Sequence, residues 1–502
     1  MTEQTGEGGP SRQPAPPPSE GGTDRSQRPT SKAFRAFIAD RWSQRSATPP
    51  QPAPSAPYAA ARRARLSARF PGERLVIPAG PLVTRSNDTD YRFRPHSAFA
   101  HLTGLGSDQE PDAVLVLHPR DGGHHSVMYA RPPAGRDTEE FFADARYGEL
   151  WVGARPTPAD LAALTGIETS PLDELAGALA AGPGGVSTRM VPGVDPAVAA
   201  MLERARTPGH EADAAADAEL AEVLSELRLV KDEFEIGQLR AAVAATAEGF
   251  ERIARSLRRA VAHPRGERVI EAAFDGHARE AGNAVGYETI AAAGDHATAL
   301  HWIRNDGAVR AGDLVLVDAG VEVESLYTAD ITRTLPVSGR FSQVQRRIYQ
   351  AVLDAADAAF AVARPGSRFR DVHTAAMEVI AARLEEWGLL PGTAADSLAP
   401  EGQFHRRWMV HGTSHHLGLD VHDCAQARKE MYLDGVLAPG MVFTIEPGLY
   451  FKADDLAVPA EYRGIGVRIE DNVLITATGN ENLSTALPRR PDDVEAWLAP
   501  LL

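Results

Sequence analysis

Four short apolar segments in the C-terminal half of the chain each carry one acidic residue, and this pattern restricts the possible folds more than any other feature. Asp318 ends the apolar run 314–317, and Asp330 lies in an alternating segment typical of a strand paired back on the first. Glu446 and Glu470 lie in segments whose two-residue period puts the acid on one face and apolar side chains on the other. Because a buried carboxylate is costly unless it is paired or binds a metal, we expect the four acids to share one site.

A histidine-rich loop, residues 411–423, completes the pattern with four of the sixteen histidines of the chain. Taken singly, each acid is more often a surface or salt-bridge residue, and each histidine a satisfied polar residue. Together, four carboxylates and one neutral imidazole balance two divalent cations, and oxygen-rich ligands favour manganese, cobalt or similar ions. Such a pair of ions can hold a hydroxide and polarise the carbonyl that it attacks, so the pattern predicts amide hydrolysis.

The composition excludes several other classes of protein. A length of 502 residues predicts two domains, and a net charge of −16 disfavours nucleic acid and anionic membranes as partners. A single cysteine, Cys424, excludes an intrachain disulfide and a thiolate zinc cluster and fits a reducing compartment. The N-terminus has no apolar core of a signal peptide, and no run of some 18 apolar residues occurs, so we expect a soluble, cytoplasmic protein.

Composition shifts along the chain predict a tail and two domains. Residues 1–55 are rich in Pro, Gly and Ser and predict a disordered tail, with a short helix near 34–42. Residues 56–222 mix strand-like and helical segments, which predicts a smaller N-terminal α/β domain. Residues 223–490 combine long helices with the acid-bearing strands, which favours an α+β domain with helices packed on a sheet. A capping box at its Ser342 and Gln345 predicts one helix start.

The amino-acid sequences and the order of these segments resemble those of aminopeptidase P, the family of Xaa-Pro aminopeptidases, over about residues 60 to 490. The resemblance rests on Asp318-Ala319-Gly320, Ala329 to Thr334, His411 to Asp423, Ile445 to Gly448 and Val467 to Asp471, and on Val83 to Tyr91 and Phe99 to Gly104 in the N-terminal domain. It implies a pita-bread catalytic domain that follows the smaller α/β domain. It also implies removal of the first residue from peptides with proline in second place.

The resemblance further implies which residues form the site. Two manganese ions would be held by Asp318, Asp330, His415, Glu446 and Glu470. Asp330 and Glu470 would bridge the ions, and Glu446 would also be the general base. His301, His411 and His422 would hold the substrate and stabilise the oxyanion, and Arg468 would orient the acidic cluster or the substrate.

Other functions are compatible with part of this pattern, and the sequence also differs from the family pattern in places. A prolidase, which cleaves only Xaa-Pro dipeptides, shares the ligands, as does a methionine aminopeptidase; a metal-free pita-bread binding protein is a more distant alternative. The family implies a homo-oligomer, either a dimer or a tetramer. The spacing from Asp318 to Asp330 is one residue longer than the family pattern, which predicts a bulge or a longer turn. His416 stands where the family commonly has a large apolar or aromatic residue, and it is predicted to line the pocket wall.

Overall fold

The computed structural model describes residues 29, 31–43, 48–180, 186–205 and 214–502. The chain divides into two compact units, residues 1–50 with 132–161 and residues 51–131 with 162–502. The described part of the first unit holds three short helices, α1 (Lys32–Ala39), α4 (Glu139–Ala143) and α5 (Glu149–Val152). Phe34 and Ile38 of α1 pack against Phe141 to Ala143. The short helix expected near 34–42 is therefore present, whereas residues 1–28, 30 and 44–47 of the predicted tail lie outside the described residues.

The N-terminal part of the second unit is built on a mixed five-stranded sheet of order β6-β5-β4-β1-β7. Its strands are β1 (Arg74–Pro78), β4 (Val114–Arg120), β5 (Gly123–Ala130), β6 (Glu168–Pro171) and β7 (Thr188–Met190), and a separate hairpin joins β2 (Thr84–Ser86) to β3 (Thr89–Asp90). The helices of this part are α2 (Ala56–Ser67), α3 (Ser97–Thr103), α6 (Pro158–Thr165), which starts in the first unit, α7 (Leu175–Ala180), α8 (Pro196–Ala205) and α9 (Ala214–Glu226). The hairpin of β4 and β5, which the apolar pattern predicted, pairs antiparallel without a shift of register.

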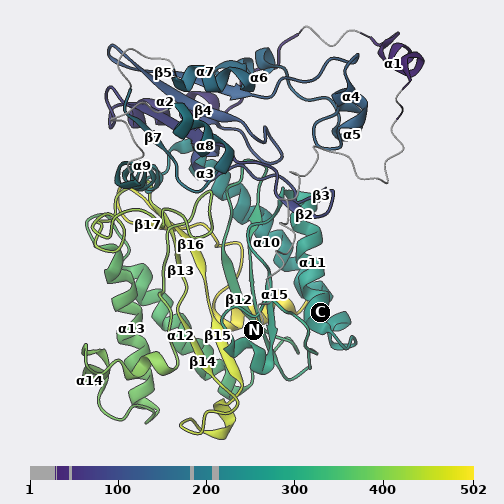
Figure 1. Cartoon of the computed structure of the whole chain (residues 1–502). Helices are drawn as coiled ribbons and strands as arrows, with labels where there is room; N and C mark the ends of the chain where they lie inside the picture. Colours follow the sequence, from purple (N-terminus) through teal and green to yellow (C-terminus); the bar gives the residue numbers. More distant parts are fainter. Residues whose placement is uncertain (1–28, 30, 44–47, 181–185, 206–213) are drawn as a thin grey trace, which may run out of the picture. The chain divides into compact units, whose positions relative to one another are not determined.

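The rest of the second unit is a layer of short antiparallel strands between two helix pairs (Figure 1). The strands are β8 (Ala284–Val285), β9 (Ile290–Ala293), β10 (Leu314–Ala319), β11 (Val321–Glu322), β12 (Ile331–Pro336), β13 (Val442–Ile445), β14 (Gly448–Phe451), β15 (Ile465–Arg468), β16 (Asp471–Ile475) and β17 (Asn480–Asn482). They form the groups β12-β10-β9, β13-β16-β17, β14-β15 and β11-β8.

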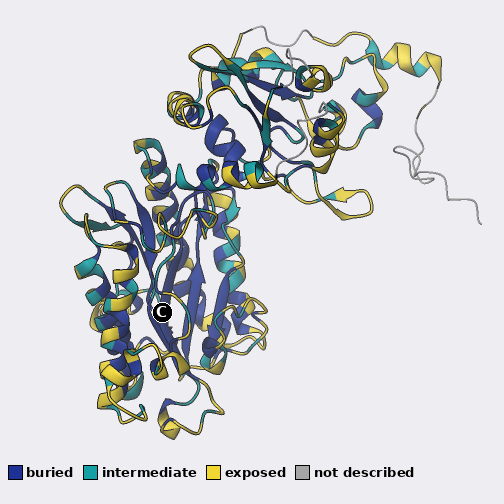
Figure 2. Ribbon diagram, turned by 60° about the vertical axis from the view of Figure 1, so that its left-hand side comes forward, coloured by how far each residue is buried: buried dark blue, intermediate teal, exposed yellow. Residues whose placement is uncertain are grey.

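Long amphipathic helices cover these strands. They are α10 (Glu233–Val261), α11 (Gly266–Ala281), α12 (Gln343–Val362) and α13 (Phe369–Glu386), with α14 (Ala394–Leu398) and α15 (Pro491–Leu498) shorter. The predicted capping box of Ser342 and Gln345 starts α12, and a second one, Asp232 with Glu235, starts α10. Buried residues concentrate on the strands and on the helix faces turned toward them (Figure 2).

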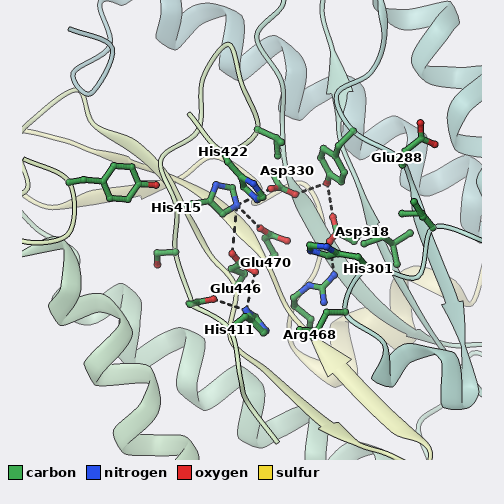
Figure 3. Close-up of a pocket in the computed structure, with 18 residues that line it drawn as sticks. Glu288, His301, Asp318, Asp330, His411, His415, His422, Glu446, Arg468 and Glu470 are labelled. Carbon is green, nitrogen blue, oxygen red and sulfur yellow. Dashed lines mark hydrogen bonds and ion pairs between the residues drawn. The ribbon is translucent and has the colours of Figure 1, made fainter. Parts of the chain in front are cut away.

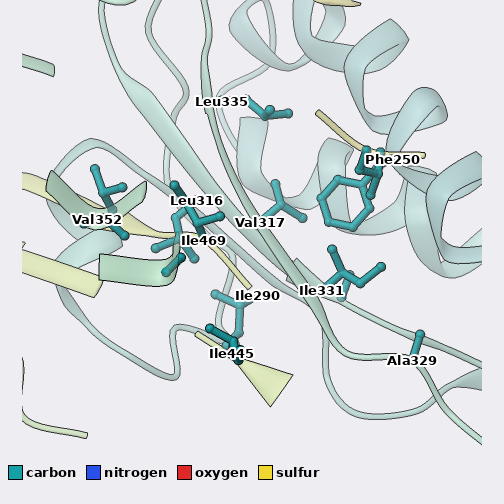
Figure 4. Close-up of a cluster of buried hydrophobic side chains, with 14 of the residues drawn as sticks. Phe250, Ile290, Leu316, Val317, Ala329, Ile331, Leu335, Val352, Ile445 and Ile469 are labelled. Carbon is teal, nitrogen blue, oxygen red and sulfur yellow. The ribbon is translucent and has the colours of Figure 1, made fainter. Parts of the chain in front are cut away.

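The strand period decides where the acids point. In β10, Val317 lies toward Phe250 of α10, whereas Leu316 lies on the other side near Ile469 (Figure 4). Asp318 shares the face of Leu316, because side chains two residues apart point the same way. The carboxylate is thereby directed away from α10 and toward the strands of the C-terminal segment.

The longer spacing between Asp318 and Asp330 is absorbed by the turn and not by a bulge. β10 and β12 pair without a shift of register from Leu314 opposite Pro336 to Ala319 opposite Ile331. The additional length lies in the connection 320–330, whose Tyr327 hydroxyl donates to Glu235 Oε1 at 2.9 Å. The strand pairing therefore keeps both acids at one end of the hairpin.

No helix within the described ranges is both long and apolar enough to cross a membrane. Cys424 is buried and unpaired.

Candidate metal centre

A cavity of about 580 Å³ opens where the acid-bearing strands meet (Figure 3). Every residue that the sequence assigned to the site lines this cavity, namely Asp318, Asp330, His415, Glu446 and Glu470 as ligands and His301, His411, His422 and Arg468 as catalytic residues. Segments separated by up to about 170 positions thus contribute to one site.

Each acid stands at or next to a strand end. Asp318 is the fifth residue of β10, Asp330 immediately precedes β12, and Glu446 immediately follows β13. Glu470 lies in the two-residue break between β15 and β16. The break between β15 and β16 leaves the Glu470 backbone N–H free to donate to Thr332 O at 3.1 Å.

Asp330, His415 and Glu470 form the tightest part of the cluster, with one ligand atom of each lying within 4.8 Å of the others. His415 Nε2 lies 3.1 Å from Asp330 Oδ2, 3.6 Å from Glu446 Oε1 and 4.0 Å from Glu470 Oε1. The Nδ1 atom of the same ring faces the carbonyl of His416 at 3.2 Å. Because Nδ1 donates to that carbonyl, Nε2 is the atom left to act as a ligand.

Asp318 is joined to the cluster through Tyr287, a residue that the sequence analysis did not select. The Tyr287 hydroxyl lies 2.6 Å from Asp318 Oδ1 and 2.5 Å from Asp330 Oδ1. Tyr287 sits in a loop before β9, and no motif or period around it marks it as functional. Only the tertiary structure places this hydroxyl between two acids.

Burial of so many carboxylates disturbs their protonation. Burial raises the pKa of Glu446 to about 7, and burial, together with the neighbouring charges of Asp330 and Glu446, raises the pKa of Glu470 well above its usual range. Burial alone would raise the pKa of Asp330, but the hydrogen bond and charge of His415 outweigh it and lower that pKa. In turn, the hydrogen bond to Asp330 and the charge of that carboxylate raise the pKa of His415 to about 9, although burial alone would lower it.

These shifts identify what the residues are suited to hold. Three buried acids, Asp318, Asp330 and Glu470, and the half-buried Glu446 face Arg468 and His415 in the cavity, so the cluster holds excess negative charge that protons relieve in part. Divalent cations would relieve it fully, and the donors are the carboxylate oxygens and imidazole nitrogen that such ions bind. The residues therefore fit a centre of divalent metal ions.

A hydrogen-bonded chain connects Asp318 with His411. Arg468 Nη2 donates to Asp318 Oδ2 at 2.5 Å, and Nη1 donates to the Tyr450 hydroxyl at 3.1 Å. That hydroxyl lies 2.8 Å from His411 Nε2, while Nδ1 of the same ring donates to Gly412 O at 2.6 Å. Burial, and then the charge of Arg468, lowers the pKa of His411 to about 3, so this imidazole is neutral. Tyr450, like Tyr287, has no sequence signal that marks it.

We expect replacement of Arg468 by lysine to lower kcat/KM by about a hundredfold. A lysine ammonium is a point charge that cannot donate at once to Asp318, Tyr450 and Thr332 Oγ1, which accepts from Nε at 3.0 Å. Steady-state kinetics with a neutral peptide substrate, with metal content measured in parallel, would check this. An R468K variant within about threefold of the unmodified protein would show that the three-way contact is dispensable.

The prediction for His416 is wrong, because this residue does not line the cavity. Its ring is buried and stacks on Phe369 with centroids 4.7 Å apart and an interplanar angle of 14°. Burial lowers the pKa of His416 to about 3. The ring of His416 packs against Phe369 and Tyr432, and Tyr432, not His416, lines the cavity.

The fold and the acidic cavity define a metallopeptidase. A family model described as metallopeptidase family M24 matches residues 237–477, and one described as the N-terminal domain of aminopeptidase P matches residues 59–185. Membership of such a family implies divalent metal ions, and the two-domain architecture with a pita-bread catalytic domain is confirmed.

Named relatives and solved structures agree with this class. Xaa-Pro aminopeptidase 1 of Streptomyces coelicolor is 54% identical over 90% of this chain and 89% of its own length, and Xaa-Pro aminopeptidase of Escherichia coli is 36% identical over 87% and 96%. Aminopeptidase PepP of Pseudomonas aeruginosa superposes with a TM-score of 0.77 at 32% identity, covering 89% of this chain and 98% of that one. Zn-substituted E. coli aminopeptidase P in complex with product gives a TM-score of 0.76 at 32% identity, covering 90% and 99%. The chain belongs to the aminopeptidase P family.

Proposed function

We propose that the chain is an Xaa-Pro aminopeptidase that hydrolyses the bond between an N-terminal residue and a penultimate proline. The observation that carries the proposal is the convergence of Asp330, His415 and Glu470 in one cavity with Asp318 and Glu446 beside them. The substrate class is supported by relatives named Xaa-Pro aminopeptidase, which share more than half of their aligned residues with this chain over most of its length. A peptide bond to proline has no N–H, so it needs a pocket that does not depend on strand-like hydrogen bonding.

Five residues are proposed as metal ligands, namely Asp318, Asp330, His415, Glu446 and Glu470, with Asp330 and Glu470 shared between two ions. When bound, two divalent cations would lower the pKa of water and polarise the scissile carbonyl. Manganese is the proposed metal, because four of the five ligands are carboxylates. Metal analysis of the purified protein tests this, and one equivalent or none would contradict the shared-ligand arrangement.

Glu446 is proposed as the general base. In the metal-free cavity burial raises the pKa of this carboxyl group to about 7, and a carboxylate beside the proposed ions can both take and return a proton. It would accept the proton of the attacking water and then deliver a proton to the proline nitrogen as that nitrogen leaves. Thr444 Oγ1 lies 3.5 Å and His411 Nδ1 3.6 Å from the two oxygens of Glu446, which limits its rotation.

The remaining site residues would bind and orient the substrate. His301, His411 and His422 line the cavity around the acids, and a neutral His411 can stabilise a developing oxyanion without adding a charge of its own. Asp318, held by Arg468 and Tyr287, would meet the free amine of the substrate. A substrate bound in this way has its first peptide bond near Glu446.

Hydrolysis of Xaa-Pro-Yaa tripeptides with added manganese tests the function directly. We expect release of the first residue from the tripeptide at a kcat/KM at least about tenfold above that for the dipeptide Xaa-Pro. A matched peptide with alanine in second place controls for general aminopeptidase activity. Preference for the dipeptide would favour a prolidase, and equal cleavage of the alanine peptide would remove the proline requirement.

Other expectations from the sequence stay predictions. A homo-oligomer, dimer or tetramer, can be checked by light scattering, and the cytoplasmic location and the domain boundaries at residues 55, 222 and 490 are untested. A metal-free binding protein would fail the tripeptide assay, and a methionine aminopeptidase would cleave only peptides that begin with methionine.

A further inference from the structure

The loop that carries His301, residues 294–307, is fastened to the domain at both ends by one buried carboxylate. Glu267, near the start of α11, has no exposed surface. Its Oε1 accepts a hydrogen bond from the Ala293 backbone N–H at 2.9 Å, and its Oε2 accepts one from the Gly307 backbone N–H at 2.6 Å. The two ends of the loop are therefore held to the same side chain.

Glu267 also holds two side chains from the middle of the loop. Oε1 accepts from His296 Nδ1 at 2.7 Å, and Oε2 accepts from Trp302 Nε1 at 2.9 Å. The rings of His296 and Trp302 stack with centroids 3.9 Å apart and an interplanar angle of 26°. Each carboxylate oxygen thus accepts two hydrogen bonds, which uses most of its capacity.

The loop packs tightly on this carboxylate. A Cβ atom at Gly307 would lie 2.6 Å from the His296 ring and 2.8 Å from Glu267 Oε2. Neither group can move away easily, because the ring is stacked and the carboxylate is held by four donors. Asn305, also buried, adds a clamp through Oδ1, which accepts from Ala291 N at 2.9 Å.

His301 depends on the loop for its position. Among the described residues none forms a hydrogen bond with the His301 side chain, yet the imidazole lines the cavity beside Asp318 and Arg468 (Figure 3). Leu300 and Ile303 of the same loop also line the cavity. An imidazole without its own hydrogen bond keeps its place only if its backbone is fixed.

We propose that Glu267 is a positioning residue for the reaction, which holds His301 at the substrate cavity through its four hydrogen bonds to residues 293–307. The proposal rests on the proposed function, since it assumes that His301 contacts the substrate. Glu267 itself does not line the cavity and touches neither the acidic cluster nor the substrate.

Replacement of Glu267 by glutamine tests whether its hydrogen bonds matter, because the volume of the side chain stays the same. Glutamine has the same size, but its amide nitrogen donates, and at either oxygen position it would face at least one main-chain N–H donor. At least one of the four hydrogen bonds is then lost, and the loop end or the ring stack must move. Aspartate in the same place keeps four acceptor sites and should retain more activity than glutamine.

A double-mutant cycle tests whether the effect passes through His301. We expect E267Q to lower kcat/KM for an Xaa-Pro-Yaa peptide by about ten- to a hundredfold, as misplacement of a substrate-binding group does. In an H301A background the same change should lower it by less than about threefold, because the positioned group is already absent. Affinity for manganese should stay within about twofold of the unmodified protein, since no proposed ligand is altered. Equal effects in both backgrounds, or loss of metal binding in step with activity, would assign Glu267 a merely structural role and overturn the proposal.

Hydrogen exchange supplies a readout that needs no activity. Amides of Ala293 and Gly307 should lose protection in E267Q while the strand amides of β10 keep theirs. E280Q, on the same helix but exposed and paired with Arg252, is the matched control and should change neither exchange nor kinetics. If E267Q does not fold, W302F, which removes one of the four donors, should lower kcat/KM about threefold and show the same dependence on His301. Unchanged hydrogen exchange in loop 294–307 of E267Q would overturn the proposal. If instead E267Q lost amide protection as expected but the unmodified protein did not hydrolyse Xaa-Pro-Yaa peptides, the proposed function would be contradicted.

Discussion

Replacing Glu446 by glutamine should reduce kcat by at least about a thousandfold while leaving the fold intact. The change keeps the volume of the side chain but removes a proposed metal ligand and the carboxylate proposed as general base. Little packing is lost, so the thermal unfolding midpoint should change by no more than about 3 °C. Steady-state kinetics on an Xaa-Pro-Yaa peptide and a thermal melt check both expectations.

The control for E446Q is the same substitution at Glu461, an exposed residue of the 3₁₀ turn Ala460–Tyr462. E461Q should keep kcat within about twofold. If E446Q retained comparable activity, Glu446 would be neither base nor essential ligand, and the proton transfers would need another group.

Removal of divalent metal by a chelator should abolish peptide hydrolysis and lower the unfolding midpoint by at least about 5 °C. Without cations, the buried carboxylates of the cluster repel one another, and ligands that bind only the native state stabilise it. Re-addition of manganese should restore both activity and stability. Full activity in chelator with no bound metal would remove the metal centre from the reaction.

The metal-free protein should also become less stable as pH rises from about 7 to 9. Below this window the buried histidines with lowered pKa values, such as His411 and His416, act in the opposite direction, because the unfolded chain protonates them more readily than the native state does. Glu446 has its pKa raised from 4.5 to about 7, so the stability it contributes is complete below 4.5 and is lost as pH rises through 7. His415 has its pKa raised from 6.5 to about 9, so its contribution is present below 6.5 and lost as pH rises through 9. Asp330, whose pKa is lowered from 3.8, titrates below this window and does not oppose the trend.

Thermal melts at pH 7, 8 and 9 with and without manganese measure this dependence. The metal-loaded protein should lose less stability over the same range, because cations take the place of the protons. A metal-free protein whose midpoint rose with pH would mean that the cluster is not held in its buried arrangement.

The sequence predicted which residue types form the site better than it predicted how these residues are arranged in space. Asp318, Asp330, Glu446 and Glu470 could be found because each interrupts an apolar, strand-period segment, where a carboxylate needs a partner. The histidine-rich loop added the nitrogen ligand, and the start of α12 followed from its capping box. These signals are local: period, cap and composition act within a few residues of the position they specify.

Residues that act through distant neighbours could not be found in this way. Tyr287 meets Asp318 and Asp330 from a loop without any pattern, and Tyr450 joins Arg468 to His411 across two strands. His416 was misplaced because the loop sequence does not reveal which way two adjacent imidazoles turn. In the sequence, Glu267 is an ordinary acidic residue in the first turn of a helix. Only the tertiary structure shows that four donors from residues 293–307 bind its carboxylate.

The sequence by itself therefore predicted which acidic side chains share one site, because the energetic cost of burying charge is visible in a one-dimensional pattern. Only the tertiary structure decided how those side chains meet, where the extra turn residue goes and what holds the loop of His301. Contacts between residues far apart in sequence depend on strand register and helix packing, which local propensity does not specify.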